Sequence, residues 1–382
     1  MNSNQSGGDI IGLGSFGCVF RPAIKCSNQK TVSDDMVSKV FFSSDSKKEA
    51  AEEIKIDNII KQIKGNQNWS HIWDKNCVPK KYSSILKEEP SIQRCLDENR
   101  ISEDNFDKYR RLLQGTYAGK PFGDVVHSMF SKSTFTNNTL FVTNFHKVMK
   151  LMKPLFIGLV EMNNSKVSHN DIKPDNIMID DDGCKFIDFG LAAKHSNTRF
   201  YKQRSMSEFV SDRIYPSYPY EFIYLYANKE VLEDEKNEKQ YDIYRDLHDR
   251  YQDVHEKIFN RTKLKEYLLG LINYHLEHGL EKHKLSVISM IDTYSVGVLF
   301  PGILVRIAKR FKKMKELQKM MHNNQVKPFI ELFKDMADPD HHERIPPKEA
   351  LRRYLELEIL YLGGKPKVEK NLQRRRVRRV SV

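Results

Sequence analysis

The chain has 382 residues, which is long enough for two lobes with separate cores. Of these residues 39% are hydrophobic, and the formal net charge is +12. Its longest near-apolar run, residues 294–305, is too short to span a bilayer. Its polar start resembles neither a signal peptide nor a myristoylation site. We therefore expect a soluble cytoplasmic protein without a transmembrane segment. The five cysteines are irregularly spaced without a C-x-x-C pair, which argues against a disulfide framework or a structural zinc site and predicts reduced thiols.

The first patterned segment, residues 11–19, has the sequence IGLGSFGCV and fits G-x-G-x-x-G-x-V. This motif is ambiguous by itself, because dinucleotide-binding folds use a similar one in which the glycines open a helix. Here strand-like residues, among them Val19 and Phe20, follow the glycines, which predicts a β-hairpin whose tip lies over phosphates. The candidate ligand-binding residues are Ile11, Gly12, Gly14, Ser15, Phe16, Gly17 and Val19.

Lys39 interrupts the apolar, β-rich run of residues 37–42, where a charge is costly unless it is paired. An acidic partner is available on the segment that follows. Ser46 and Glu49 form a capping-box pattern, which predicts a helix over residues 46–64. The candidate partners of Lys39 on this helix are Glu49, Glu52 and Glu53.

A dense group of polar residues occupies residues 167–176, VSHNDIKPDN, and Asp-Phe-Gly follows at residues 188–190. The segments between them have the composition of two short strands, and the turn Asp-Asp-Asp-Gly that joins them predicts a hairpin. A hairpin brings its two ends together. The chemically important side chains expected at this point are Asp171, Lys173, Asn176 and Asp188.

The pattern HxDxKPxN followed by DFG resembles the catalytic core of eukaryotic-type serine/threonine protein kinases, and the departures described below resemble kinases encoded by large DNA viruses. The resemblance implies an α+β, bilobal fold, with a small lobe at residues 1–116 that holds an antiparallel sheet and one main helix, and a larger, mainly helical lobe at residues 117–364. It also implies an enzyme that transfers the γ-phosphoryl group of ATP to Ser or Thr hydroxyls of protein substrates with the help of Mg²⁺. A viral enzyme of this kind would be located in the host cytoplasm or the virion.

The resemblance assigns roles to the polar residues of the catalytic region. Asp171 matches the catalytic base, and Lys173 matches the residue that neutralises the transferring phosphate. Asn176 and Asp188 match the Mg²⁺ ligands.

The resemblance also identifies the expected nucleotide contacts. Lys39 matches the lysine that contacts the α- and β-phosphates, and Glu53 best fits the family's Glu-apolar-x-apolar pattern for the acidic partner of that lysine. Residues 114–119 resemble the hinge that binds adenine, and Asp124 is a candidate for the ribose.

Three further features resemble family motifs in the larger lobe, and one residue departs from them. Residues 218–221, YPYE, stand where kinases carry A-P-E, and residues 292–297, DTYSVG, resemble D-x-W-S-x-G. Arg344 resembles the late arginine that pairs with the A-P-E glutamate, which predicts a structural ion pair with Glu221. Asn170 replaces the arginine of H-R-D, so we expect an enzyme that is active without phosphate on its activation loop.

Two segments have no counterpart in the pattern. The insert at about residues 222–291 is charged and largely helix-forming, as expected of a surface elaboration or a partner-binding subdomain. The basic tail, residues 365–382, is expected to be disordered and can bind nucleic acid, an acidic partner or an anionic membrane surface. Ser381 in this tail is a candidate autophosphorylation site, which would agree with a preference for basic substrate sequences.

Two alternative functions remain open from the sequence. A catalytically inactive scaffold of the same fold typically lacks one or more of Lys39, Asp171, Asn176 and Asp188, and all four are present. A small-molecule phosphotransferase with a related lobe generally lacks the DFG, A-P-E-like and D-x-x-S-x-G motifs as a set.

Overall fold

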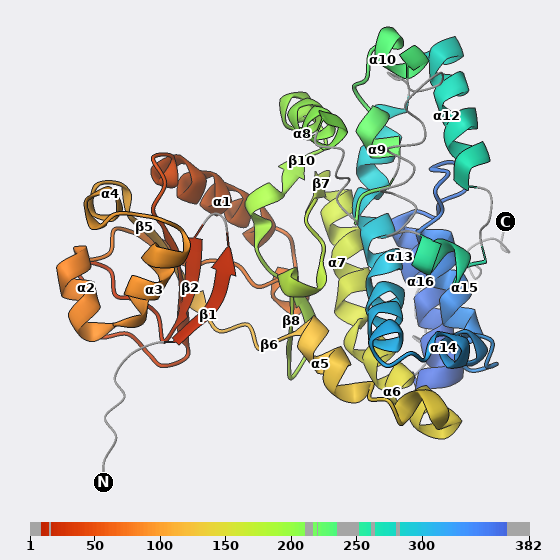
Figure 1. Cartoon of the computed structure of the whole chain (residues 1–382), viewed down its shortest axis with the longest axis horizontal. Helices are drawn as coiled ribbons and strands as arrows, with labels where there is room; N and C mark the ends of the chain where they lie inside the picture. The colour runs from red at the N-terminus through yellow and green to blue at the C-terminus, as the bar shows by residue number, and fades with distance from the viewer. Residues whose placement is uncertain are drawn as a thin grey trace, which may run out of the picture.

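The computed structural model describes residues 9–14, 17–210, 217–219, 221–234, 252–260, 264–279 and 283–364. A small lobe built on a β-sheet lies beside a larger lobe built mainly of helices, and the chain passes from the first to the second once (Figure 1). This is the bilobal α+β kinase fold that the sequence predicts. The basic tail, residues 365–382, lies outside the described residues.

The sheet of the small lobe has five antiparallel strands in the order β1-β2-β3-β5-β4. The strands are β1 (Asp9–Gly14), β2 (Gly17–Arg21), β3 (Met36–Phe41), β4 (Lys75–Cys77) and β5 (Arg111–Thr116). β3 is central and almost wholly buried, as its apolar run requires. Its position places Lys39 inside the lobe rather than at a solvated edge.

Helix α1 (Ser46–Lys61) packs against β5 and is the main helix of this lobe. The predicted capping box is wrong: Asp45 is the N-cap without a side-chain cap, and Glu49 accepts a hydrogen bond from the Ser43 hydroxyl at 3.0 Å. The helix also ends three residues before the predicted end, because the chain turns away through Gly65, whose φ of 75° suits a residue without a Cβ.

Residues 65–110 form a compact excursion over the small lobe, with the helices α2 (Tyr82–Glu88), α3 (Ser91–Glu98) and α4 (Glu103–Tyr109). Helix α3 packs on β1, and this path brings distant cysteines together. Cys18 is bonded to Cys95 and Cys26 to Cys77, so the prediction of reduced thiols without a disulfide framework is wrong for these four. Cys184 is a free, buried thiol.

Two small sheets lie at the start of the larger lobe. The strands β6 (Lys120–Pro121), β8 (Ile177–Asp180) and β9 (Gly183–Phe186) form one, and β7 (Val167–Ser168) pairs with β10 (Ala193–Lys194) in the other. The predicted hairpin is confirmed as β8–β9, with Ile177 opposite Phe186 and Asp180 opposite Gly183. Gly119 lets β6 approach β8, because a Cβ there would lie 2.0 Å from the carbonyl oxygen of Ile179.

The larger lobe is mainly helical, with one large core cluster and a second, smaller cluster that includes Tyr201, Tyr218 and Ile291. Its α-helices are α5 (Phe122–Met129), α6 (Asn138–Leu151), α7 (Lys153–Asn164), α8 (Thr198–Val210), α9 (Glu221–Tyr224), α10 (Lys229–Asp234), α12 (Leu264–His278), α13 (Lys284–Arg310), α14 (Met314–Met321), α15 (Lys327–Met336) and α16 (Pro347–Leu357). The shorter helical turns are η1 (Asn66–Asn68), η2 (Thr134–Thr136), η3 (Pro174–Asn176), η4 (Phe189–Leu191), η6 (Gln252–Glu256) and η7 (Glu358–Leu362). Helix α13 runs through the centre and contacts α15, α14, α7 and α5.

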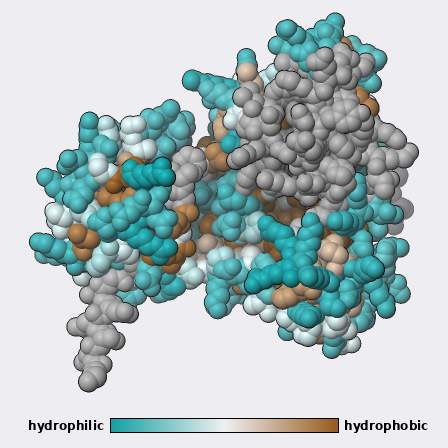
Figure 2. All heavy atoms as spheres, viewed as in Figure 1, coloured by the Kyte–Doolittle hydropathy of each residue, from teal (hydrophilic) through white to brown (hydrophobic). Residues whose placement is uncertain are grey.

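Helix α13 is long and apolar enough to cross a membrane by length and composition, and 83% of its most apolar window is buried inside the protein. Burial on nearly all sides is what a central core helix requires. On the face drawn in Figure 2 the surface is mainly hydrophilic over both lobes, and hydrophobic atoms gather along the seam between them.

Two helices of the insert, α10 and α12, pack together at one end of the larger lobe (Figure 1), whereas η6 packs against α13. Leu271 and Ile272 of α12 are buried in the core cluster of that lobe. The insert therefore shares its apolar interior with the larger lobe along this helix.

Candidate active site

The glycine-rich segment forms the β1–β2 hairpin rather than the start of a helix, as predicted. Ile11 sits at an irregularity in the pairing, between Ile10 opposite Phe20 and Gly12 opposite Val19. Ile11 is 47% exposed, which leaves an apolar side chain of the hairpin open to contact a ligand. Ser15 and Phe16, at the tip, lie outside the described residues.

Gly17, the last glycine of the motif, is needed for packing within the sheet. A Cβ at this position would lie 2.0 Å from the carbonyl oxygen of Val40 on β3. Val19, two residues later, pairs with Lys39 across the β2–β3 ladder. The hairpin and the lysine strand are thus locked in one register, which fixes where Lys39 stands beneath the hairpin.

Lys39 lies between two carboxylates. Its Nζ is 2.9 Å from Glu53 Oε2 and 3.0 Å from Asp188 Oδ1. Burial alone would lower the pKa of Lys39, but the two carboxylates outweigh burial and raise it, so the ammonium is charged. Burial likewise opposes ionisation of Asp188, yet the adjacent Lys39 holds the pKa of that carboxyl below its usual value. Of the three candidates on α1, Glu53 is the partner of Lys39.

Glu53 is held by a second donor that no motif predicts. The indole Nε1 of Trp73 donates to Glu53 Oε1 at 2.6 Å, and the backbone N–H of Trp73 donates to Asp57 Oδ2 at 3.0 Å. Trp73 belongs to the excursion, so this segment ties down α1 through both carboxylates and holds Glu53 beside Lys39. Burial, with Glu53 adding to it, raises the pKa of Asp57 to about 8.

The loop that precedes β8 holds Asp171 hydrogen-bonded to both Lys173 and Asn176. Asp171 Oδ2 accepts hydrogen bonds from Asn176 Nδ2 at 2.6 Å and Lys173 Nζ at 3.0 Å. The Asn176 amide also donates to the Asp171 carbonyl oxygen at 2.9 Å, and the Ile187 N–H donates to the Asn176 carbonyl oxygen at 3.0 Å. The last of these bonds joins the two ends of the β8–β9 hairpin, so the catalytic loop and the segment leading to Asp188 are adjacent.

Helix α13 anchors the catalytic loop through hydrogen bonds to its backbone. Asp292 accepts the backbone N–H groups of His169 and Asn170 at 2.6 and 3.0 Å, and burial raises its pKa. His169 Nδ1 accepts the Asp171 N–H at 3.3 Å, and its Nε2 lies 3.0 Å from the Ile187 carbonyl oxygen. These contacts fit a neutral ring with the proton on Nε2. These contacts give a structural reason for the histidine at position 169 and for the acidic residue Asp292 at the start of the segment 292–297.

Asn170 ties the catalytic loop to the segment that follows Asp188. Its φ is 60°, a left-handed value that asparagine adopts more readily than other residues with a side chain. Its Nδ2 donates to the carbonyl oxygens of Ser168 and Leu191 at 3.1 and 3.2 Å and lies 3.4 Å from the Tyr201 hydroxyl. Tyr218 donates to the Asn170 carbonyl oxygen at 2.5 Å. These neutral hydrogen bonds occupy the place where a phosphate-binding arginine is usual.

Phe189, directly after Asp188, is held by apolar contacts. Phe189 is buried against His169 with ring centres 4.7 Å apart, and its turn packs on α1. Of the serines that the sequence offers for modification, Ser205 is fully buried and donates to the Ile223 carbonyl oxygen at 3.1 Å, Ser207 is exposed and Ser211 lies outside the described residues.

The predicted Glu221–Arg344 ion pair is confirmed, with Arg344 Nη2 2.6 Å from Glu221 Oε1 and both side chains sealed from solvent. The contact lacks the alignment of a hydrogen bond, and Arg344 donates instead to the carbonyl oxygens of Asp338 and Pro339. Burial raises the pKa of Glu221 against the effect of Arg344.

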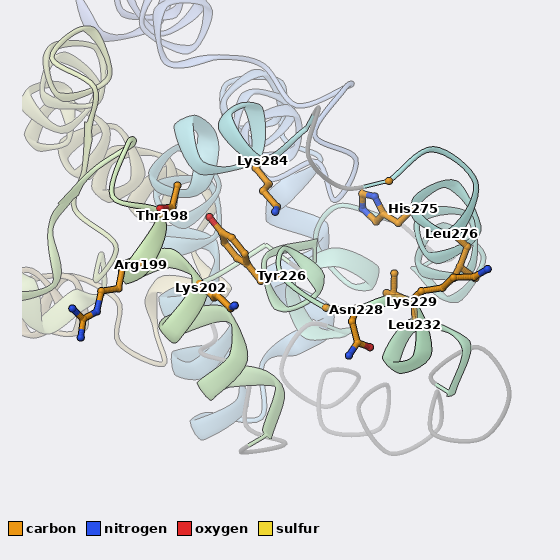
Figure 3. Close-up of a pocket in the computed structure, with 12 residues that line it drawn as sticks. Thr198, Arg199, Lys202, Tyr226, Asn228, Lys229, Leu232, His275, Leu276 and Lys284 are labelled. Atoms are coloured by element: carbon orange, nitrogen blue, oxygen red, sulfur yellow. The ribbon is translucent and has the colours of Figure 1, made fainter.

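The adenine and ribose candidates lie where the two lobes join. Residues 114–116 end β5, residues 117–119 connect it to β6, and Asp124 is exposed in the first turn of α5. A separate pocket of about 880 Å³ lies at α8, α10 and α12, and its basic lining includes Arg199, Lys202, Lys229 and Lys284 (Figure 3). None of the predicted nucleotide-binding or catalytic residues lines this pocket.

Comparison with known proteins agrees with this geometry. The family model for the protein kinase domain matches residues 123–355. Two curated proteins of Mus musculus, sperm motility kinase 3A and sperm motility kinase 3B, are each 44% identical over 50 residues, which is 13% of this chain. The matched segment covers only 10% of each of these relatives. Because the family model covers more than half of the chain, the chain belongs to the protein kinase family.

Proposed function

We propose that this protein kinase is a serine/threonine kinase that uses ATP and Mg²⁺, with Asp171 as the catalytic base. The observation that carries the proposal is the joint placement of two groups, Lys39 between Glu53 and Asp188, and Asp171 bonded to Lys173 and Asn176. An inactive scaffold has no need for a buried lysine held charged at a lobe junction. The same groups are those that phosphoryl transfer uses for positioning and charge stabilisation.

The residues present fit a nucleotide with its metal. Asp188 is 38% exposed at its side chain and offers carboxylate oxygens, the ligand type that Mg²⁺ prefers. Asn176 uses its Nδ2 to bond Asp171, so its amide oxygen is the atom suited to the same ion. When bound, Mg²⁺ would neutralise charge on the phosphates. Lys39 would orient the α- and β-phosphates once its contact with Asp188 is exchanged for them.

The chain's own groups then position the acceptor. Asp171 is fixed from three sides, by Asn176, by Lys173 and by the backbone contact of its N–H with His169. A hydroxyl that approaches Asp171 would meet a carboxylate oriented to receive its proton, with Lys173 beside it to balance charge on the transferred group. Lys173 favours Ser or Thr as the acceptor, because tyrosine kinases carry a different pattern after the aspartate.

We further propose that the kinase is active without phosphate on its activation segment. Asn170 makes neutral hydrogen bonds to Leu191 and accepts one from Tyr218, so the segment is held at both ends without an arginine–phosphate contact. Treatment of the purified protein with a phosphatase should leave the rate unchanged. Loss of activity that ATP preincubation restores would contradict this part of the proposal.

The test of the main proposal is labelled ATP with a mixed protein substrate, followed by analysis of the phosphorylated amino acids. Asp171→Asn should lower the rate about 10²- to 10⁴-fold, the usual contribution of a general base. Asp181→Asn is the matched control, since it makes the same change on the exposed turn of the β8–β9 hairpin. Label on tyrosine alone would overturn the Ser/Thr assignment, and equal labelling by wild type and Asp171→Asn would overturn the assignment of the base.

A further inference from the structure

Three histidines from distant parts of the sequence meet beside the insert. His283 caps the N-terminus of α13, and His341 and His342 lie between α15 and α16. One potential ligand atom from each of the three lies within 4.8 Å of the others. The ring centres are 5.3 Å apart for His283 and His341 and 5.1 Å apart for His283 and His342.

His341 is the least ordinary member of the group. It is 4% exposed, and among the described residues neither of its ring nitrogens has a hydrogen-bond partner. A buried imidazole with both nitrogens unsatisfied is costly, so its retention calls for an explanation.

Aromatic stacking explains only part of the cluster. Tyr274 stacks on His278 with ring centres 4.5 Å apart, and its hydroxyl lies 2.8 Å from His283 Nε2. These contacts satisfy His283 and His278 but leave the nitrogens of His341 without a partner. The dipole at the N-terminus of α13 opposes a cation, yet this effect is screened and confined to the first turn.

We propose that His283, His341 and His342 bind one Zn²⁺ ion. Three imidazoles form a donor set that suits zinc and related transition metals rather than Mg²⁺. Nitrogens on one zinc lie about 3.3 Å apart, given Zn–N bonds of about 2.0 Å, so small rotations of the rings complete the site. His342 is exposed, which leaves a fourth position for water. The Tyr274 hydroxyl on His283 is the kind of outer contact that orients a ligating imidazole.

The ion would join the insert to the rest of the larger lobe. His283 starts α13 directly after the insert helix α12, and His342 stands two residues before Arg344, the partner of Glu221. His275 of α12 is buried nearby and faces the basic pocket (Figure 3). Zinc would thus hold the insert against the turn that leads to Arg344, whose ion pair with Glu221 lies at the end of the activation segment. The sequence lacks the C-x-x-C pairs typical of cysteine zinc sites, and this site uses histidines alone.

The experiment uses the full chain without a histidine tag, stripped with a chelator and titrated with ZnCl₂ in excess Mg²⁺, which occupies oxygen ligands such as Asp188. We expect one zinc per chain by elemental analysis, a rise of the unfolding temperature with zinc, and visible absorption bands when Co²⁺ replaces zinc. His342→Ala should weaken zinc binding at least about tenfold, the lower end of what even an outer contact contributes.

Two further variants make the result decisive. His341→Gln removes the buried ligand and should abolish the cobalt bands, while His342→Ala, at an exposed position, guards against loss of fold. His322→Ala is the matched control, because His322 is exposed and lies outside the cluster. Zinc binding by His342→Ala equal to that of wild type, or less than one zinc per wild-type chain, would overturn the proposal. This outcome is independent of whether the kinase assay succeeds.

Discussion

Lys39–Glu53 and Arg344–Glu221 are both short, buried ion pairs, but they differ in what surrounds them. Lys39 has a second acidic neighbour, Asp188, whose side chain is 38% exposed. Arg344 and Glu221 are 0% and 1% exposed, and Arg344 also contacts two backbone carbonyls and the ring of Tyr294. The first pair can exchange a partner for a ligand, whereas the second has no ligand to exchange with. A buried ion pair therefore indicates function only when one of its partners is replaceable.

The strongest test of this comparison is Lys39→Met. It removes the cation that would hold the phosphates, so the rate of phosphoryl transfer should fall about 10²- to 10³-fold, the usual effect of losing one preorganised charge donor. The unfolding temperature should fall by less than in Arg344→Met, because the freed Asp188 lies next to solvent and the buried Glu53 still accepts the hydrogen bond from the Trp73 indole. Steady-state kinetics and thermal unfolding of the same samples check both parts. A variant with full activity would mean that Lys39 is structural.

Arg344→Met should give the opposite pattern. It leaves Glu221 buried without its partner, at a cost of about 3–5 kcal/mol in the free energy of unfolding. The double variant Glu221→Leu/Arg344→Met should recover most of this loss, because no uncompensated charge remains. Urea unfolding measures the effect, and activity below the unfolding transition should be close to wild type. If the double variant is no more stable than the single one, the pair is not the reason for the loss.

The smallest expected effect is the pH dependence of stability that comes from Asp57, which lies on the same helix as Glu53, the partner of Lys39. Its pKa is about 8 in the folded protein against 3.8 ordinarily, so between these values the folded state keeps a proton that the unfolded state releases. The stability from this group is therefore complete at low pH and declines as the pH rises toward 8. The decline is on the order of a few kcal/mol.

Asp57→Asn removes this titration while an amide oxygen can still accept the Trp73 N–H. The difference in unfolding temperature between variant and wild type, followed from pH 5 to pH 9, isolates Asp57, because other titrating groups are common to both proteins. The wild type should lose stability with rising pH relative to the variant. Parallel curves would show that Asp57 titrates normally.

The part of the site that the sequence predicts is the part fixed by local spacing. Lys39 follows the glycine hairpin through one β-strand register, and Asn176 and Asp188 are the two ends of a hairpin, so their proximity needs no knowledge of the rest of the chain. Glu53 could be chosen among the glutamates of its helix because it fits the family's Glu-apolar-x-apolar pattern. The fold class follows from the same motifs.

The parts that the sequence does not predict depend on the path of long, unpatterned segments. The contact of Trp73 with Glu53 and the Cys18–Cys95 bond both require the excursion to fold back over the small lobe. The histidine cluster requires the insert to meet the turn before Arg344. The failed capping box has a different cause: Ser43 provides Glu49 with a better local donor than the helix end does.

The excursion also gives the protein an optical reporter of its own active site. The two tryptophans of the chain are both in it. Trp73 donates to Glu53, so its fluorescence should respond when α1 moves or Lys39 changes partner. Trp69 is fully buried, and its carbonyl oxygen accepts the Phe186 N–H at 2.9 Å, so it reports on the strand that leads to Asp188. Nucleotide binding can therefore be followed in the unlabelled protein.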